Sequence, residues 1–251
     1  MTLLKNTVLL LKSDTMDDKY TNLLKATNFK VMIVKTLVFQ YKNLEMLREK
    51  LLSVDNYSGI LLSSPRCVSA VNQTLEKKQI QELWGHKSNF TVGESTYKEA
   101  QDKLGVECQG KESGNAKNLS QIIIQNKTQF TKPFLFPHGN LKTDTLKLEL
   151  GKENVLIEEV LVYDTLPNPD IGQELSECTN NFTDIPEFII YFSPSGLHSS
   201  IKYLRKLLTD CDDVKIIAIG PVTELALQDQ NLKVHAVAKS PTPEEILNTL
   251  T

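Results

Sequence analysis

The stretch FIIYFSPSGLHSSIKYL, residues 188–204, joins a continuous apolar run to a helical pattern through a Ser-Pro-Ser-Gly turn. A second stretch of the same form, GILLSSPRCVSAVNQTL, occupies residues 59–75. Continuous apolar runs of this length are typical of strands that are buried on both faces of a parallel sheet. Proline suits the first helical position, because the N–H that it lacks is not needed there. Both stretches therefore predict a buried strand, a tight turn and a helix.

The same order of elements recurs along the rest of the chain. Residues 6–39 and residues 132–165 each read as strand, polar turn, helix and strand. Two further turns have Gly at the end of an apolar run and Thr three positions later. They are Gly93 with Thr96 and Gly220 with Thr223, and they lie 127 positions apart. The offset between matching features stays between 124 and 129 along the chain. An offset that persists over this length indicates an internal duplication.

The alternation of strands and helices predicts the fold class. Parallel sheets with helices on both faces follow from this pattern, so we expect an α/β protein with two doubly wound, flavodoxin-like parallel sheets. The segments near Phe39 and Tyr163 are expected to be crossings between the two bodies. Pro167 and Pro169 support this for the second crossing, because proline cannot donate to the ladder of a central strand.

Composition and charge exclude several classes of protein. The chain has 251 residues, 40% of them hydrophobic, and a formal net charge of −3, which predicts neither nucleic-acid nor membrane-surface binding. No apolar run is long enough to span a membrane, and neither a dinucleotide fingerprint nor a phosphate-binding P-loop is present. The scattered histidines and cysteines predict no metal site. We expect a cytoplasmic protein with four free thiols, at Cys67, Cys108, Cys178 and Cys211.

The repeated turns are candidate binding sites for an acidic ligand. In open α/β sheets, ligands bind beyond the carboxyl ends of the strands, and helix starts there offer unpaired N–H groups to an anion. Arg66 could add a bidentate contact to a carboxylate; alternatively, it forms a solvated or structural salt bridge. Each Ser or Thr could also serve only as a helix cap. The candidate substrate-binding residues are Ser64, Arg66, Gly93, Thr96, Ser195, Gly196, Gly220 and Thr223.

Seven motifs in their order along the chain resemble the uroporphyrinogen-III synthase family, most closely the animal enzymes: SSPR, VGESTYKEA, LFPHGN, VYDT, YFSPSGL, AIGPVTELAL and SPTPEEIL. The resemblance runs from Val8 to Leu250, although residues 76–87 and 171–185 match nothing firmly. It implies one discontinuous domain (1–38 with 169–251) and one inserted domain (43–162). It also implies that the crossings, 39–42 and 163–168, form a two-stranded ladder beside a cleft. The duplication alone would suggest a division near residue 128.

The resemblance also implies an activity. The family cyclises hydroxymethylbilane, a linear tetrapyrrole with eight carboxylates, to uroporphyrinogen III in heme biosynthesis, with loss of water and inversion of ring D. The enzyme needs no cofactor or metal and is a monomer, and transient contact with the preceding pathway enzyme is expected. Tyr163 matches the tyrosine that is discussed as catalytic, so we expect it to donate a proton to the departing hydroxyl; alternatively, it is a packed strand aromatic. His138 is expected in a strand-to-helix turn and is not favoured as the acid. A non-catalytic, two-lobed sensor of an acidic small molecule is the alternative function.

Overall fold

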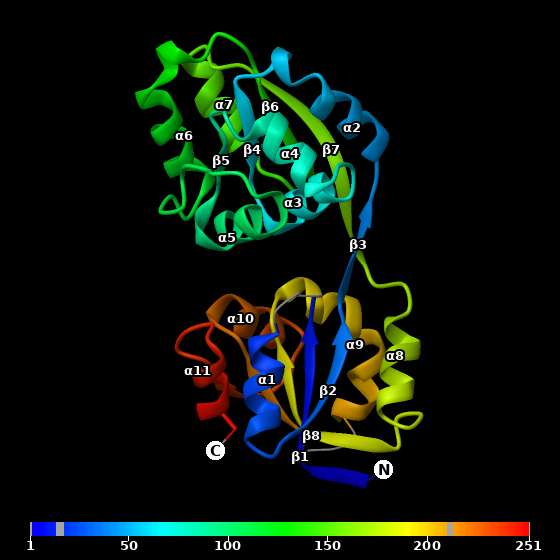
Figure 1. Ribbon diagram of the computed structural model, residues 1–251. Coiled ribbons are helices and arrows are strands. Elements are labelled where there is room, and N and C mark those ends of the chain that lie inside the picture. The colour runs from blue at the N-terminus through cyan, green and yellow to red at the C-terminus, as the bar shows by residue number, and fades with distance from the viewer. Residues whose placement is uncertain (1, 14–17, 210–212, 251) are drawn as a thin grey trace. The chain divides into compact units, whose positions relative to one another are not determined.

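The computed structural model describes residues 2–13, 18–209 and 213–250, which form two compact units. Unit 1 comprises residues 1–38 and 166–251, and unit 2 comprises residues 39–165. The elements of unit 1 are β1 (Thr2–Lys12), α1 (Lys19–Ala26), β2 (Lys30–Lys35), α8 (Ile171–Cys178), β8 (Asp184–Tyr191), α9 (Pro194–Thr209), β9 (Lys215–Ala218), α10 (Pro221–Asp229), β10 (Val234–Val237) and α11 (Pro243–Asn248) (Figure 1).

Unit 2 contains the remaining elements, together with two short 3₁₀ turns at Val54–Asn56 and Lys127–Gln129. They are β3 (Leu37–Tyr41), α2 (Leu44–Leu52), β4 (Gly59–Leu62), α3 (Pro65–Asn72), α4 (Lys77–Trp84), β5 (Phe90–Thr91), α5 (Gly93–Leu104), α6 (Ala116–Gln125), β6 (Phe134–Gly139), α7 (Thr145–Lys152) and β7 (Ile157–Pro167).

The sheet of unit 1 has the strand order β2-β1-β8-β9-β10, and each pair of neighbouring strands is parallel. The interior strand β1, between β2 and β8, buries side chains on both faces, as its continuous apolar sequence predicts. Leu9 and Leu11 pack with α8, α9 and α10, whereas Val8 and Leu10 pack with α1 and α11. Helices therefore cover both faces of the sheet, which is the doubly wound arrangement.

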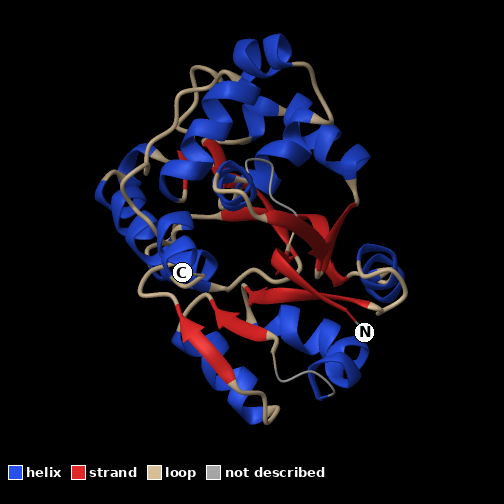
Figure 2. Ribbon diagram, turned by 90° about the horizontal axis from the view of Figure 1, so that it is seen from below, coloured by secondary structure: helices blue, strands red, loops and turns tan. Residues whose placement is uncertain are grey.

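The sheet of unit 2 has the order β3-β7-β6-β4-β5. One face packs against α2, α3, α4 and α5, and the other packs against α6 and α7. Strand β4 again alternates, because Ile60 and Leu62 belong to the first core and Leu61 to the second. Figure 2 shows the strands in red and the helices that pack beside them in blue.

The two sheets share one topology once the repeated segments are matched. The order β2-β1-β8-β9-β10 corresponds to β7-β6-β4-β5 in unit 2, where the fifth position is a single bridge between Phe90 and Gln109. At this position only one pair of residues forms a parallel bridge. Both units thus have the flavodoxin-like order 2-1-3-4-5.

The chain passes between the units within β3 and again within β7, and these two strands are neighbours in one sheet. The predicted two-stranded connection is therefore present. Pro167 is the last residue of β7, where it interrupts no central ladder. The division that the structure shows falls at residues 38/39 and 165/166, and not near residue 128.

Candidate functional site

Unit 2 contains a cavity of about 240 Å³ beside the carboxyl ends of β4 and β6. These strands are the neighbours at which the strand order reverses, and ligands bind at such switch points in open α/β sheets. The described lining residues include four hydroxyl side chains and one cation among apolar groups: Ser63, Ser64, Val92, Ala116, Phe136, Gly139, Leu141, Lys142, Thr143, Leu146 and Tyr163.

Tyr163 lies flat against the backbone at Gly139, the partner of Tyr163 in the β6–β7 register. A Cβ atom at position 139 would lie 2.4 Å from Cζ of the Tyr163 ring, so only glycine leaves room for it. The rings of Phe39 and Tyr41 meet the Tyr163 ring edge-on, with centroids 6.2 and 6.5 Å away. The ring is therefore held on several sides, which fixes the direction of its hydroxyl.

The hydroxyl of Tyr163 lies 3.3 Å from Oγ of Ser64. Burial raises the pKa of Tyr163 above the usual value, and the neighbouring Cys67 thiol adds to this. The phenol is therefore protonated at neutral pH and can donate a hydrogen bond or a proton. Ser64 also caps α3, because its Oγ accepts from the N–H of Cys67 at 3.4 Å. Both interpretations of Ser64, as a helix cap and as a site residue, are thus compatible with the structure.

Three other candidates of unit 2 have structural tasks. The guanidinium carbon of Arg66 lies 3.4 Å from the centroid of the Phe39 ring, so Arg66 stacks on that ring. Gly93 has a φ of +76°, which favours glycine, and its N–H donates to Gly110 and Ser113. The binding hypothesis expects this N–H to face a ligand, whereas in the structure it is already bonded within the protein. Thr96 is only 2% exposed, which places its side chain inside the protein.

In unit 1, Ser195 and Gly196 lie at the start of α9, as predicted. Ser195 is exposed, and its Oγ lies 3.0 Å from Oγ of Ser193. The N–H of Gly196 donates to the Ser193 Oγ at 3.1 Å, so Ser193 caps this helix. Thr36 packs against Gly196 from the end of β2.

Gly220 and Thr223 form the start of α10. The Gly220 carbonyl accepts from the N–H groups of Thr223 and Glu224, both at 3.1 Å. Thr223 is 3% exposed, so its side chain, like that of Thr96, faces the interior. Contact between the Thr223 hydroxyl and a ligand therefore stays a prediction.

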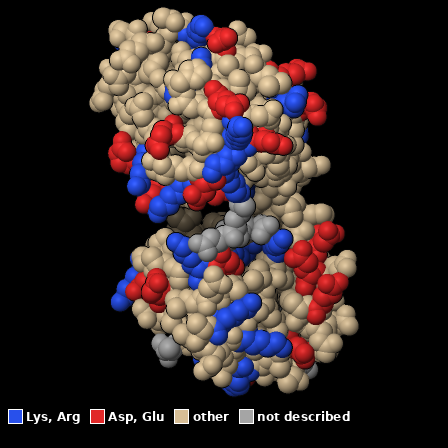
Figure 3. All heavy atoms as spheres, viewed as in Figure 1, with Lys and Arg blue, Asp and Glu red and all other residues tan. Residues whose placement is uncertain are grey.

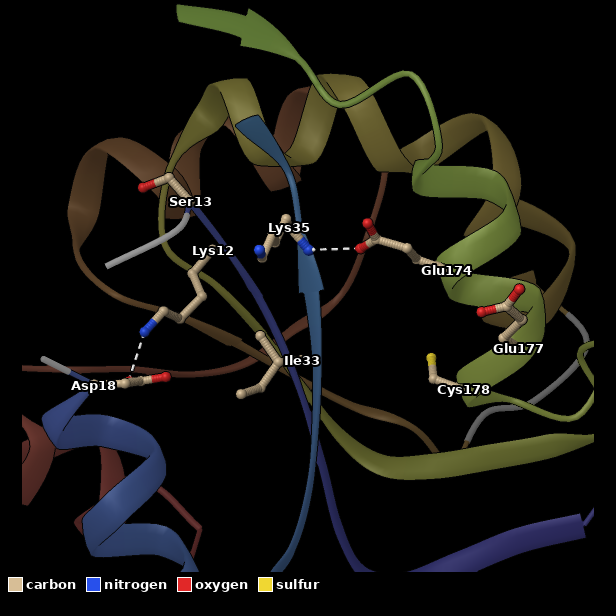
Figure 4. A pocket seen from close by; sticks show the side chains of 8 residues that line it. All are labelled: Lys12, Ser13, Asp18, Ile33, Lys35, Glu174, Glu177 and Cys178. Atoms are coloured by element: carbon tan, nitrogen blue, oxygen red, sulfur yellow. Dashed lines mark hydrogen bonds and ion pairs between the residues drawn. The ribbon is translucent and has the colours of Figure 1, made fainter. Parts of the chain in front are cut away.

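A second cavity, of about 580 Å³, lies in unit 1 near the ends of β1 and β2 (Figure 4). The Lys12 ammonium is buried there, 2.6 Å from Asp18 Oδ1. Burial would by itself raise the pKa of Asp18, but hydrogen bonds from Lys12 and Thr21 outweigh it and lower that pKa. Carboxylates of Glu174 and Glu177 and the side chain of Lys35 also line this cavity, so its charged groups are of both signs.

Sequence reasoning missed three residues that the structure brings to these sites. Gly139 and Lys142 lie in or beside the quoted LFPHGN motif, and a glycine between a strand and a helix could have drawn attention to the first. Lys12 ends a buried strand, where a charged residue is unusual. His138 lies within β6 and not in the expected turn, with Nδ1 2.9 Å from the Gly139 carbonyl oxygen.

The fold and the cavity together define a doubly wound α/β protein of two units, with a partly polar cavity at the carboxyl ends of two strands of unit 2. The chain belongs to the family described as uroporphyrinogen-III synthase HemD, whose family model matches residues 18–248. It is accordingly a cyclising hydro-lyase of heme biosynthesis. The resemblance seen in the sequence is confirmed at the level of the family.

Two curated fungal proteins named uroporphyrinogen-III synthase are similar over nearly the whole chain. The protein of Schizosaccharomyces pombe is 25% identical over 252 residues, which cover 97% of this chain and 96% of that protein. The protein of Saccharomyces cerevisiae is 26% identical over 265 residues, with 97% and 94% covered. A solved uroporphyrinogen-III synthetase structure from Helicobacter pylori has a TM-score of 0.60 at 17% identity and covers 96% of both chains, which supports the fold.

None of the described helices is long and apolar enough to cross a membrane. Among residues 2–13, 18–209 and 213–250, no group of three or more His, Cys, Asp or Glu side chains is placed to hold a metal ion. Cys67, Cys108 and Cys178 are free thiols, and Cys211 lies outside the described residues. Figure 3 shows acidic and basic side chains intermixed on the visible face.

Proposed function

We propose that this chain binds hydroxymethylbilane and converts it to uroporphyrinogen III with Tyr163 as the proton donor. The observation that carries the proposal is the Tyr163–Ser64 hydroxyl pair, 3.3 Å apart, in the cavity at the switch point of unit 2. A protonated, oriented phenol is suited to the step in which the substrate loses its hydroxyl group. The family membership supplies the reaction to which this geometry is assigned.

The helix starts at the strand ends are proposed to hold the substrate carboxylates. Helices α3, α9 and α10 each begin with proline or a serine–proline turn and present the positive end of the helix dipole. Because Thr96 and Thr223 are buried, we assign them to the shaping of the first turns of α5 and α10, and we assign direct contact to the exposed Ser195. Arg66 is proposed to orient Phe39 beside Tyr163 as well as to attract carboxylates.

Proton donation by Tyr163 would balance the first chemical step. The C–O bond to the hydroxyl breaks, the phenol supplies a proton, and water leaves, which gives a delocalised cation on the substrate. Attack on this cation by the substituted carbon of ring D, followed by fragmentation and reclosure, inverts that ring. The unaided substrate closes to the type I isomer, so the protein must mainly control the conformation of the chain.

The proposal also covers the localisation, the oligomeric state, the substrate delivery and the domains of the chain. We propose that the chain works as a cytoplasmic monomer, that it receives its reactive substrate through transient contact with the preceding enzyme, and that residues 1–38 with 169–251 and residues 43–162 act as its two domains. Analytical ultracentrifugation of the full chain at micromolar concentration would test the monomer, and a dimer would contradict it.

The isomer assay tests the central proposal. The purified chain is incubated with enzymatically generated hydroxymethylbilane, and the oxidised products are separated into type I and type III isomers. We expect mostly type III product, in proportion to the amount of protein. Type I product alone, at the rate of the protein-free control, would instead favour the non-catalytic sensor.

A further inference from the structure

The cavity of unit 2 contains a cation that no sequence motif singled out. Lys142 is the one charged side chain among the described residues that line the cavity. It lies in the loop between β6 and α7, and only 18% of its side chain is exposed. A lysine with so little exposure requires a negatively charged partner.

The loop that carries Lys142 is anchored beside Tyr163. The N–H of Asn140 donates to the carbonyl of Tyr163 at 3.1 Å. The side-chain amide of Asn140 also bonds the backbone of Thr165 in both directions, at 2.8 and 3.3 Å. The position of Lys142 is therefore tied to the strand that presents the candidate acid.

Two carboxylates neutralise Lys142 in the described structure. Its Nζ lies 2.6 Å from Oδ1 of Asp144 and 2.7 Å from Oε1 of Glu159. Burial would by itself lower the pKa of Lys142, but these partners raise it, so the amine is charged at neutral pH. Glu159 is 21% exposed and also pairs with Lys147, whereas Asp144 is 65% exposed. Asp144 is thus the partner that can leave more easily.

The position of Asp144 offers it an alternative partner. It is the N-cap residue of α7, but its side chain makes no cap hydrogen bond there and is turned to Lys142 instead. Aspartate is a preferred N-cap, because its carboxylate can accept from the first free N–H groups of the helix. If an anion replaced Asp144 at Lys142, Asp144 could cap α7. The exchange would then cost little free energy.

The walls of the cavity indicate the chemistry of the anion. Val92, Phe136 and Leu146 form an apolar part suited to a flat, carbon-rich ring, and hydroxyls of Ser63 and Thr143 lie among the polar groups. The volume of about 240 Å³ is below the ~300–1,000 Å³ typical of sites that enclose a whole drug-sized ligand. The cavity therefore suits one ring of a larger molecule together with its acid side chain.

We propose that Lys142 binds a carboxylate of the substrate ring seated beside Tyr163, and that Asp144 is an internal counter-ion which this carboxylate displaces. The inference rests on the proposed function for the identity of the substrate. It adds a binding residue and an exchange of counter-ions. Lys142 is a positioning residue in this scheme, because it holds the ring and takes no part in proton transfer.

Binding of uroporphyrin III, an octacarboxylic porphyrin, tests the inference without turnover. The Kd is measured by porphyrin fluorescence for the wild-type chain and for Lys142→Met, which keeps most of the apolar stem. We expect the Kd to rise about tenfold, as for loss of a hydrogen bond to a charged group. Lys142→Arg should stay within about threefold, because the cation remains. The control Lys152→Met removes the same charge from the same segment, at an exposed pair with Glu149, and should change the Kd less than twofold.

The displacement is tested by Asp144→Asn, which keeps a good N-cap but removes the competing charge. We expect its Kd to fall severalfold in the wild-type background and to stay unchanged in the Lys142→Met background, as a double-mutant cycle reports coupling. Equal effects of Lys142→Met and Lys152→Met, or weaker binding of Asp144→Asn, would overturn the inference. Because binding is measured apart from the isomer assay, a wild-type chain that binds the porphyrin but forms no type III product would contradict only the proposed function.

Discussion

At the scale of the residue, removal of the Tyr163 hydroxyl distinguishes a role in catalysis from a role in packing. Tyr163→Phe keeps the ring that Gly139, Phe39 and Tyr41 surround and removes only the hydroxyl group. If the phenol donates the proton, single-turnover formation of the type III isomer should slow by about 10²–10⁴-fold, the usual range for general acid catalysis. Binding of uroporphyrin III should change little. A rate within threefold of the wild-type value would end the acid assignment and leave the family assignment untouched.

Gly139 allows a complementary test of orientation. In Gly139→Ala the added methyl group would meet the Tyr163 ring at about the 2.4 Å found for an ideal Cβ, so the ring must move. We expect the rate of type III formation to fall by more than tenfold, because small misplacements of a catalytic group are costly. Gly151→Ala, in α7 with nothing within 4 Å of an added Cβ, is the control and should keep its activity. Full activity of Gly139→Ala would show that the position of the Tyr163 ring is not critical.

At the scale of the element, two helix caps of the same design allow stability and function to be separated. Ser64 caps α3 and Thr242 caps α11, each followed by proline and each accepting a backbone N–H three residues on. Replacement of either by Ala should lower the free energy of unfolding by about 1 kcal/mol. Only Ser64→Ala should also lower the rate of isomer formation, because only Ser64 contacts Tyr163. Urea unfolding measures the stability of the two variants, and single turnover measures their activity. Equal activity of the two variants would show that Ser64 acts only as a helix cap.

At the scale of the whole molecule, each unit has its own core on both faces of its own sheet, so the units should unfold in separable steps. The only tryptophan of the chain, Trp84, is buried in unit 2 and reports that unit alone. Asp18→Asn in unit 1 removes the carboxylate of the buried Lys12–Asp18 ion pair and should cost about 1–3 kcal/mol. The far-ultraviolet transition should therefore shift, and the Trp84 fluorescence transition should not.

The same variant predicts a pH dependence. The folded-state pKa of Asp18 is lowered, so its contribution to stability is fully present above the unfolded value of about 3.8 and is lost as the pH falls through the folded value. The difference in stability between the wild-type chain and Asp18→Asn should thus be constant from pH 7 to pH 5 and shrink below pH 4. A difference that does not shrink as the pH is lowered below 4 in urea titrations, or a joint shift of both optical transitions at pH 7, would contradict this account.

The candidate site shows which residue roles the sequence could predict. The N-cap of Ser64 and the turn at Ser195 follow from local chemistry, because Ser followed by Pro favours a helix start wherever it occurs. The roles of Gly139 and Lys142 depend on β7 and α7, which approach them only in the folded chain. Their environment is tertiary, so no pattern around position 139 or 142 could have assigned them.

The sequence by itself determined the strand–turn–helix units, their duplication and the parallel sheets, because hydrophobic period and cap chemistry act over a few residues. It did not determine which units share a sheet. The strand at 59–62 and the strand at 184–191 resemble each other, and β1 could have paired with either by local criteria. In the structure β1 pairs with β8, and β4 pairs with β6, so each unit combines parts of both repeats. Only the long-range burial of whole sheet faces distinguishes these pairings, and that burial exists in the tertiary structure alone.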